Sequence, residues 1–502
     1  MHATIPDLMR HAASTYGTRE FLRFPDTSLT FADADARSDG LAAALIDKGV
    51  RPGDRVAIMM DNVPGWPLSW LAVLKAGAVT VPVNVRYRAA DLEHVLRDSG
   101  AVATLTTDEH APHIPGTVYV LDAEHRGEHR GEHRGEHCGE HCGKRPALTH
   151  EIANFQYTSG TTGFPKACML THDYWLRTAR LIADQVRLRD DDVMLIAQPY
   201  SYMDPQWATL FCLVGGIPLV VLPRFSASGF WASVREHGAT LTYVLGSMPL
   251  LLHKQPPHPH DRENRMRLVL CSGIRPDLHR AFEERWGAPW RELYGSTESG
   301  PDLGVPIDAV ETVGTGAMGL AYPGKEVTLA EETGEILVRG TPMMNGYWNH
   351  PEATAHAFRD GWYHTGDLGF RDEHGYIHHS GRLKDMVRRG GENISCAEVE
   401  GVLTEHPAVL QAAVVPVPDD LFGELPKAFI QLRPGHTADA GTAGSIIGHA
   451  RERLARFKIP EYVEFVAEFT LTPSSRIEKR HLLDPQKDQR AAPAIAIPKE
   501  RT

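Results

Sequence analysis

Residues 157–166 read Tyr-Thr-Ser-Gly-Thr-Thr-Gly-Phe-Pro-Lys, and this stretch decides how the rest of the chain is interpreted. Four hydroxyl side chains surround two glycines, and a lysine follows. Glycine lets the backbone come close to a ligand, so that N–H groups, hydroxyls and one ammonium can converge on an oxygen-rich anion. A triphosphate fits this set of donors best. The residues expected to contact it are Thr158, Ser159, Gly160, Thr161, Thr162, Gly163 and Lys166.

This stretch is not the common P-loop. Its two glycines are three positions apart, and Lys166 is followed by Ala167 where the P-loop has Ser or Thr. Taken alone, the stretch could also be a solvated polar turn, so its function depends on the motifs that follow it.

Helix-like and strand-like segments alternate around this stretch. Helical spacing at 36–48, 66–76 and 89–98 is followed each time by glycine and a short apolar strand. Further strand-like runs occupy 193–197, 217–222, 241–245 and 268–271. This alternation predicts an α/β fold with two stacked, mainly parallel subdomains.

The pattern changes after residue 384. A short helix at 398–404, strands at 412–417, 428–432 and 462–466, and a helix at about 443–456 predict a small α/β lobe. We therefore expect an N-terminal domain at 1–383, a C-terminal domain at 384–482 and a frayed tail at 483–502.

Composition excludes several classes of partner. The net charge is −12 and the chain has no long basic block, so we expect no nucleic-acid partner. The early apolar stretch at 66–83 is interrupted by Lys75 and two prolines, so we expect no membrane span. Six scattered cysteines and the lack of a signal-like N-terminus predict a reduced, cytoplasmic protein. The expected oligomeric state is a monomer or a homodimer.

Residues 124–143 consist of Glu-His-Arg-Gly three times and Glu-His-Cys-Gly twice. No residue of this repeat can bury much apolar area, so the repeat is expected to be a solvent-exposed insertion. Zinc binding by His137, Cys138, His141 and Cys142 is the alternative, but their spacing does not match common zinc sites.

Six further motifs follow in order. They are Tyr294-Gly-Ser-Thr-Glu298, Gly334–Gly340 with Asn345-Gly-Tyr-Trp348, Gly361–Asp367, Gly381–Asp385 and Gly390-Gly-Glu-Asn-Ile394. With the hydroxyl-rich stretch, they resemble the adenylate-forming superfamily, which includes acyl- and aryl-CoA synthetases, adenylation domains and firefly-type luciferases. The resemblance covers about residues 5–482.

The resemblance implies ATP and Mg²⁺ as ligands, with CoA as a possible co-substrate. Glu298 matches the metal-binding carboxylate, and Thr297 the residue that touches the α-phosphate. Asp367 and Arg382 match residues that bind the ribose, and Lys384 matches the hinge of a mobile C-terminal lobe. The expected adenine slot comprises Ser272, Gly273, Ile274 and Tyr294. Gly295, Ser296 and Thr297 are further residues expected to bind the nucleotide. Alternatively, Glu298 could be a surface charge, Asp367 a turn residue, and 390–393 only a hairpin turn.

Two departures from the superfamily pattern concern catalysis and substrate. Arg476 stands where the family has a lysine that bridges the incoming carboxylate and the α-phosphate, and arginine presents a planar fork in place of a compact ammonium. Tyr202 stands at a position where related CoA ligases often have histidine. That segment lines the acid pocket in relatives, so Tyr200, Tyr202 and Gly246 are the expected pocket residues.

Two functions are therefore compatible with the sequence. The first is an ATP-dependent, AMP-forming ligase that adenylates a small, aromatic acid and transfers it to CoA. The second is the diazotase branch, which activates nitrite with ATP and diazotises an aromatic amine. Carrier-protein loading and nucleotide binding without catalysis are the remaining alternatives.

Overall fold

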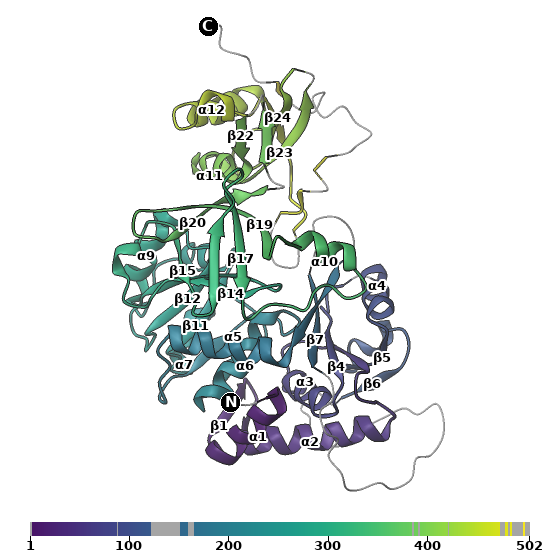
Figure 1. Cartoon of the computed structure of the whole chain (residues 1–502). Helices are drawn as coiled ribbons and strands as arrows, with labels where there is room; N and C mark the ends of the chain where they lie inside the picture. The colour runs from purple at the N-terminus through teal and green to yellow at the C-terminus, as the bar shows by residue number, and fades with distance from the viewer. Residues whose placement is uncertain are drawn as a thin grey trace. The chain divides into compact units, whose positions relative to one another are not determined.

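The computed structural model of the chain describes residues 3–87, 89–121, 151–158, 165–383, 386–389, 392–419, 421–471, 477–479, 482–483 and 495–496. The chain forms two compact units. The first consists of Met1–Val327 and Val338–Tyr363, and the second of Thr328–Leu337 and His364–Thr502. Figure 1 gives the order of the elements along the chain.

One sheet of the first unit contains the two strands that flank the hydroxyl-rich stretch. Its strand order is β6-β5-β3-β4-β7-β8, and all neighbouring pairs are parallel except β7 with β8. The strands are β3 (Arg55–Met59), β4 (Val79–Pro82), β5 (Ala101–Thr106), β6 (Val118–Val120), β7 (Ile152–Thr158) and β8 (Lys166–Thr171). The helices α2 (Phe31–Asp47), α3 (Gly65–Lys75) and α4 (Ala89–Ser99) alternate with β3, β4 and β5 along the chain.

The other sheet of the first unit has the order β2-β1-β10-β9-β11-β12-β13-β14-β15. From β1 to β13 all pairs are parallel, and β2, β14 and β15 are antiparallel to their neighbours. The strands are β1 (Glu20–Phe24), β2 (Thr27–Thr30), β9 (Met194–Ile196), β10 (Leu219–Val221), β11 (Leu241–Leu245), β12 (Leu268–Ser272), β13 (Trp290–Ser296), β14 (Gly300–Gly304) and β15 (Ala317–Ala321). The remaining elements of the unit are α1 (Ile5–Tyr16), α5 (His172–Gln185), α6 (Met203–Gly215), α7 (Phe230–Glu236), α8 (Met248–His253), α9 (Pro276–Trp286), α10 (Pro351–Ala357) and β18 (Phe358–Arg359).

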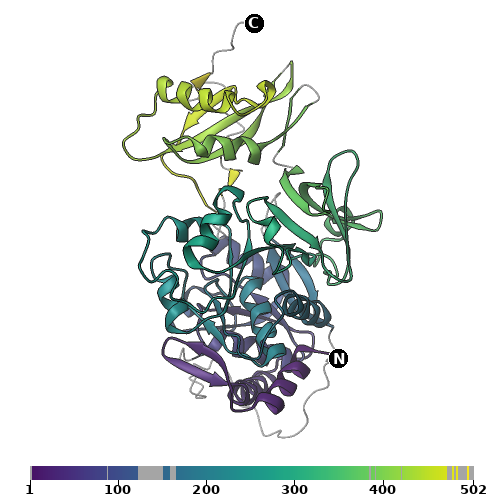
Figure 2. The same ribbon diagram turned by 90° about the vertical axis from the view of Figure 1, so that its left-hand side faces the viewer.

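Alternating strand residues enter two different cores. Leu268 and Leu270 of β12 belong to a large cluster that also contains side chains of α1, α2, α3, α5 and α6. Val269 and Cys271 pack on the opposite face, against α7 and α9. Both faces of the parallel strands are thus covered, which is why these strands are nearly continuously apolar in sequence. Figure 2 shows α1 and α2 lying side by side near the β1–β2 hairpin.

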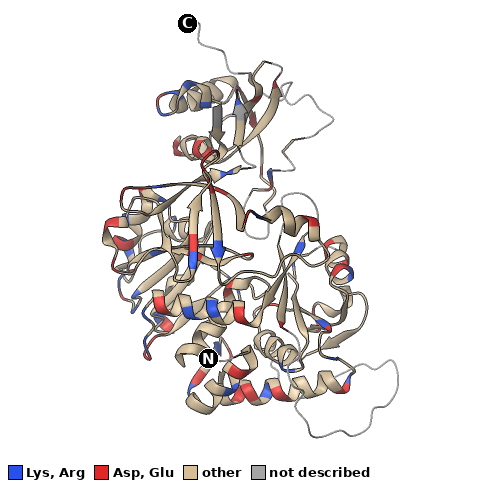
Figure 3. Ribbon diagram, viewed as in Figure 1, with Lys and Arg blue, Asp and Glu red and all other residues tan. Residues whose placement is uncertain are grey.

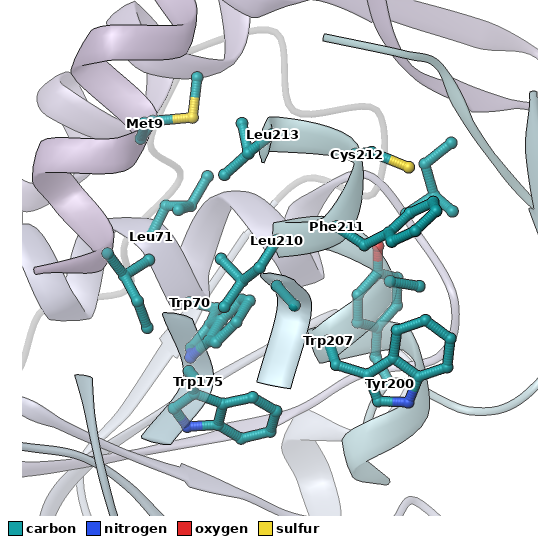
Figure 4. Packing of buried hydrophobic residues seen from close by; sticks show 14 of the residues in the cluster. Met9, Trp70, Leu71, Trp175, Tyr200, Trp207, Leu210, Phe211, Cys212 and Leu213 are labelled. Carbon is teal, nitrogen blue, oxygen red and sulfur yellow. The ribbon is translucent and has the colours of Figure 1, made fainter. Parts of the chain in front are cut away.

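Aromatic rings anchor the large core. The Trp70 and Trp175 rings meet edge to face with centroids 5.7 Å apart (Figure 4). The buried Trp70 indole N–H donates to Asn154 Oδ1 at 3.0 Å, so its polar atom is satisfied within the core. Outside the core, α5 carries basic residues between two acidic ones (Figure 3), and the exposed Arg177 and Asp173 form an ion pair at 2.6 Å.

The second unit has its own core. Its main sheet has the order β22-β21-β24-β25-β26, with β23 also paired to β24. Buried residues of α11 and α12, including Val399, Leu403 and Ile446, pack against this sheet. The elements with residues in this unit are β16 (Lys325–Leu329), β17 (Glu335–Gly340), β19 (Trp362–Arg371), β20 (Ile377–Arg382), β21 (Met386–Arg389), β22 (Glu392–Ser395), β23 (Val409–Asp419), β24 (Gly423–Leu432), β25 (Tyr462–Phe465), β26 (Ile495–Ala496), α11 (Cys396–Glu405) and α12 (Ala440–Arg451). Of these, β16, β17 and β19 also have residues in the first unit.

The predicted fold class is confirmed: both units are α/β, and the first contains two mainly parallel sheets. The element bounds differ in places. The helix predicted from 36 begins at Phe31, because Thr30 and Asp33 form a capping box in which each side chain accepts the other residue's backbone N–H. The helix predicted to reach about 456 ends at Arg451.

Several expectations stay predictions. The domain boundary and hinge at 384 fall on a residue outside the described ranges, as do the repeat at 124–143 and its zinc alternative. Two residues of the expected tail, Ile495 and Ala496, pair with β25 rather than fraying, because the open edge of that strand offers them a ladder partner. In the described part of the chain, no helix is both long and apolar enough to cross a bilayer.

Candidate functional site

The hydroxyl-rich stretch connects two antiparallel strands. Thr158 ends β7 and Lys166 begins β8, and the two residues are register partners. The expected triphosphate contacts of Thr158 and Lys166 therefore start from neighbouring positions. Ser159, Gly160, Thr161, Thr162 and Gly163 lie outside the described residues, so their role as phosphate ligands stays a prediction.

Glu298 lies beside the ends of this stretch. Its Oε1 accepts a hydrogen bond from the Tyr347 hydroxyl at 2.9 Å and one from the Thr158 hydroxyl at 3.5 Å. The Lys166 ammonium lies over the Tyr347 ring, 5.3 Å from its centroid. The structure thus brings together the expected metal carboxylate and both described ends of the expected phosphate loop.

Backbone pairing with β8 fixes the position of Tyr347. The Met169 N–H donates to Gly346 O at 3.0 Å, and the Trp348 N–H donates to Ala167 O at 2.9 Å. Gly346 has φ +108° and a Cβ there would lie 2.8 Å from Thr354 Cγ2, so this turn requires glycine. The segment therefore runs along β8 and delivers the Tyr347 hydroxyl to Glu298.

Gly295 and Ser296 end β13, and Thr297 begins the turn that leads to β14. A Cβ on Gly295 would lie 2.1 Å from Gly300 O, because the two strands approach closely at an irregularity in their register. The Ser296 and Ser299 hydroxyls are hydrogen-bonded at 2.9 Å. The Thr297 hydroxyl donates to Met203 Sδ at 3.6 Å, and its carbonyl accepts from the Tyr174 hydroxyl at 2.9 Å. These contacts hold the turn that ends at Glu298.

A buried ion pair supports this turn. The Lys325 ammonium lies 3.1 Å from Asp302 Oδ1, and both side chains are fully buried. The ammonium also donates to the carbonyl oxygens of Ser299 and Pro342. Lys325 therefore ties β16 to the segment next to Glu298.

Glu292 organises the expected adenine slot. Its two carboxylate oxygens accept backbone N–H groups of Gly273, at 2.5 Å, and Ile274, at 2.9 Å. Burial raises the pKa of Glu292 to about 7, and these two hydrogen bonds act in the opposite direction. Gly273 has φ +96°, and Tyr294 lies two residues beyond Glu292 on β13. Gly273, Ile274 and Tyr294 are thus placed on adjacent strand ends.

The three expected pocket residues have different environments. Tyr200 is fully buried, stacks on Trp66 with ring centroids 4.8 Å apart, and is hydrogen-bonded to Thr209 Oγ1 at 3.1 Å. These contacts are those of a core residue and give no support to a pocket role, because neither face nor hydroxyl is left for a ligand. The half-buried Tyr202 hydroxyl accepts from the Asn84 amide at 3.2 Å. Gly246, with φ +60°, donates its N–H to Ser272 O at 3.2 Å.

Asp367 and Arg382 are brought together within the second unit. They are register partners on β19 and β20, and the Arg382 Nε lies 2.8 Å from Asp367 Oδ1. The preceding Gly366 donates its N–H to Glu335 at 2.9 Å, which fixes the turn before Asp367. The two residues that the resemblance assigns to the ribose therefore form a pair. Lys384 and Arg476 lie outside the described residues, and their roles stay predictions.

Sequence reasoning missed two residues of this site. Tyr347 belongs to the quoted Asn345–Trp348 motif, but the spacing to Glu298 gives no sign of their contact. Glu292 precedes the Tyr294–Glu298 motif, and its position two residues before Tyr294 was the signal available. In both cases the contact depends on strand pairing between distant segments.

Comparison with known proteins identifies relatives along nearly the whole chain. The family model "AMP-binding enzyme" matches residues 9–348, and "AMP-binding enzyme C-terminal domain" matches residues 398–476. A feruloyl-CoA synthase of Amycolatopsis sp is 34% identical over 91% of this chain and 94% of its own. A crotonobetaine/carnitine–CoA ligase of Escherichia coli is 32% identical over 86% of this chain and 89% of its own.

Solved structures agree with these relatives. The o-succinylbenzoate CoA synthetase of Bacillus subtilis in complex with its acyl-adenylate intermediate has a TM-score of 0.83 and 26% identity, covering 96% of this chain and 98% of its own. The same synthetase in complex with ATP and a magnesium ion has a TM-score of 0.81 and 27% identity, covering 95% and 99%.

Proposed function

This chain belongs to the AMP-binding enzymes, within the ATP-dependent acyl- and aryl-CoA ligases, and we propose that it adenylates a small aromatic acid and transfers the acyl group to CoA. The observation that carries this proposal is the contact of Glu298 with Thr158 and with Tyr347, whose ring lies under the Lys166 ammonium. The feruloyl-CoA synthase relative supports an aromatic acid.

The residues around Glu298 fit a magnesium ion. Mg²⁺ prefers oxygen ligands and takes only one or two from protein, keeping phosphate oxygens and water for the rest. Glu298 offers a carboxylate oxygen, and Thr158 adds a hydroxyl beside it. When bound, the ion neutralises charge on the phosphate oxygens. Glu298 would hold it, and the Tyr347 hydrogen bond would keep the carboxylate oriented.

The first half-reaction joins two anions. A carboxylate oxygen of the acid forms a bond to the α-phosphorus of ATP, and the bond from that phosphorus to pyrophosphate breaks. Lys166 and the hydroxyl of Thr297 would stabilise the negative charge that develops on the phosphate oxygens. In the second half-reaction the CoA sulfur attacks the acyl carbon, the thiol proton is lost, and AMP leaves.

Nucleotide selection would fall to two groups of residues. Glu292 holds the Gly273–Ile274 backbone, which we assign to the adenine slot together with Tyr294. Asp367 can accept hydrogen bonds from ribose hydroxyls, and its pairing with Arg382 keeps the carboxylate oriented. Both assignments rest on the resemblance and on the geometry within each unit.

The arginine at 476 and the hinge at Lys384 extend the proposal to the C-terminal lobe. Arg476 would supply the charge that lysine supplies in relatives, and Lys384 would absorb the rotation between the two half-reactions. The diazotase alternative, with nitrite and an aromatic amine as substrates, draws its motivation from Arg476 and receives no support from the relatives. Oligomeric state and a cytoplasmic location also stay predictions.

Pyrophosphate release tests the proposal. The full-length protein with Mg-ATP is offered aromatic and aliphatic acids, with and without CoA, and separately nitrite with an aminoarene. Release with an aromatic acid, followed by a thioester in the mass spectrum when CoA is present, is the expected result. Release only in the reaction with nitrite and the aminoarene would replace the ligase proposal by the diazotase. No release with any substrate would favour a binding protein.

A further inference from the structure

A carboxylate lies among aromatic rings at the start of α6. Asp204 is in the first turn of this helix, directly after Tyr202 and Met203. Its carboxylate accepts hydrogen bonds from the Trp207 side chain and from its own backbone N–H. It also lies close enough to Tyr202 and Tyr243 to act on the pKa of both hydroxyls. Asp204 therefore faces three aromatic side chains from two elements and a connecting segment.

Two of these three aromatic rings pack against each other in the interior. Trp207 and Tyr243 are both buried and meet edge to face, with centroids 5.5 Å apart. Tyr202 is half-buried and directed to Asn84, and Asp204 itself is also half-buried. Residual solvent access to Asp204 and Tyr202, next to the buried Trp207 and Tyr243, places the carboxylate at the edge of the packed interior.

Among the residues that the structure describes, no Lys, Arg or His forms an ion pair with Asp204. Burial raises the pKa of Asp204 to about 6, and only two hydrogen bonds oppose that effect. A desolvated carboxylate is costly unless it is paired or protonated, so Asp204 is poised to gain from an added cation or N–H donor.

The position of this group connects it to the reaction centre. Met203, the residue before Asp204, accepts the Thr297 hydroxyl on its sulfur at 3.6 Å. On the other side, the Tyr243 hydroxyl donates to Ser272 Oγ at 2.8 Å, and Ser272 precedes the Gly273–Ile274 backbone. Asp204 thus lies between the turn that ends at Glu298 and the segment assigned to adenine.

We propose that Asp204 and Tyr202, which lie next to the buried Trp207 and Tyr243, bind the far end of the acid substrate, and that this end carries a protonated amine. The inference rests on the proposed function, because it assumes that an acid is adenylated near Thr297. An ammonium would pair with the carboxylate and lie against the half-buried Tyr202 ring, while the buried Trp207 and Tyr243 keep water from the carboxylate. Both interactions strengthen where water is excluded. Asp204 is then a specificity-determining residue.

Isosteric pairs of acids test this assignment. The ammonium of 4-(aminomethyl)benzoate occupies the place of the terminal methyl in 4-ethylbenzoate, so the two differ in charge and little in size. The same holds for 6-aminohexanoate and heptanoate. For each pair, kcat/KM is measured by ATP–pyrophosphate exchange with the wild type, with Asp204→Asn and with Asp191→Asn. Asp191 is exposed in the loop before β9 and is the matched control.

The wild type and Asp191→Asn should prefer the ammonium member of at least one pair by about tenfold or more, as expected for a desolvated charge pair. Asp204→Asn should lose this preference and keep its activity with the apolar member. An aspartate that only stabilises the helix start would, when replaced, slow both members equally. Equal effects on both members, or no preference in the wild type, would overturn the proposal.

Calorimetry of the same acids, with a non-hydrolysable ATP analogue present, separates this inference from the proposed function. Asp204-dependent binding of the ammonium acid without exchange would uphold the assignment of Asp204 and reject adenylation. Exchange with acids that does not depend on Asp204 would uphold adenylation and reject the assignment of Asp204. The absence of both exchange and Asp204-dependent binding would overturn the two together.

Discussion

The Tyr347 hydroxyl donates a hydrogen bond to Glu298 Oε1 over 2.9 Å, although 49 residues separate the two in sequence. Tyr347 lies on the segment whose backbone is hydrogen-bonded to β8, and Glu298 lies in the turn after β13. Because β8 begins at Lys166, this single contact ties the expected metal ligand to the strand that leaves the phosphate loop. Burial raises the pKa of Tyr347, and the Glu298 carboxylate raises it further, so the hydroxyl remains a donor.

Removing this hydroxyl should weaken metal binding without destroying the fold. In Tyr347→Phe the ring still packs, but Glu298 loses its hydrogen bond, worth about 1.5–3 kcal/mol for a charged acceptor. We expect the apparent KM for Mg²⁺ to rise about tenfold, read from pyrophosphate release at fixed ATP. Tyr119→Phe, on β6 in the same unit, is the control. Equal Mg²⁺ dependence in both variants would show that Tyr347 does not position the carboxylate.

The charge of Glu298 should matter more than its size. Glu298→Gln keeps the shape and one oxygen but removes the negative charge that Mg²⁺ needs. Adenylation should fall on the order of 10²-fold or more at saturating acid, measured by pyrophosphate exchange. Glu373→Gln, at an exposed turn, should leave the rate unchanged. A fully active Glu298→Gln enzyme would remove Glu298 from the proposed site.

Glu292 predicts a specific dependence of stability on pH. Burial raises its pKa in the folded state from 4.5 to about 7, so the folded chain binds this proton more tightly than the unfolded chain. The stability from this group is fully present below about pH 4.5 and is lost as the pH rises through 7, by on the order of 3 kcal/mol. Glu292→Gln cannot ionise and should escape this loss.

The urea midpoints of wild type and Glu292→Gln at pH 5, 6, 7 and 8 measure the effect. The variant should be the less stable protein at pH 5, because a glutamine side chain has only one acceptor oxygen for the two N–H groups of Gly273 and Ile274. As the pH rises, the wild type should lose stability and the variant should not, so the difference between their urea midpoints should change in favour of the variant. A difference that is constant with pH would contradict the raised pKa.

The buried pair of Lys325 and Asp302 should be strongly coupled. Lys325→Met leaves a fully buried carboxylate unpaired, which typically costs about 3–5 kcal/mol. Replacing both residues, as in Lys325→Met with Asp302→Leu, should cost less than Lys325→Met alone, in urea unfolding. Arg187→Met breaks an exposed ion pair with Asp308 and should cost under about 1 kcal/mol. A small cost for Lys325→Met would show that the pair is hydrated.

Arg476 is the sequence departure with the clearest kinetic test. If its guanidinium contacts the developing charge, Arg476→Ala should slow adenylation on the order of 10²-fold and leave thioester formation from added acyl-adenylate less affected. Arg476→Lys introduces the residue that the resemblance to the adenylate-forming superfamily leads us to expect at this position. A faster lysine variant would indicate that arginine is a weakened substitute, whereas an unchanged alanine variant would exclude a role for this position.

Much of the fold could be read from local patterns. The strand at Leu241–Leu245 has the predicted bounds, and β12 and α4 agree to within one residue, because apolar periodicity and glycine stops are properties of consecutive residues. The motif order likewise proposed Glu298, Asp367 and Arg382 as site residues, and these roles stay predictions. The pairing of Asp367 with Arg382 then follows from the register of β19 and β20.

Other features depend on contacts between distant segments. Tyr200 was expected in the acid pocket because of its place in the sequence, but its ring stacks on Trp66 in the core. The Tyr347–Glu298 contact, the Glu292 clamp on Gly273 and Ile274, and the aromatic surroundings of Asp204 join side chains from different strands and helices.

The sequence by itself determined the fold class, the family and which carboxylates are candidates for the functional site. Motif spacing and apolar periodicity, on which these depend, are local properties of the chain. Only the tertiary structure decided which of those side chains are partnered, which are buried and which retain access to solvent. The reason is that burial and hydrogen bonding are set by sheet register and packing between segments that are far apart in sequence, and these determine the charge that each group carries.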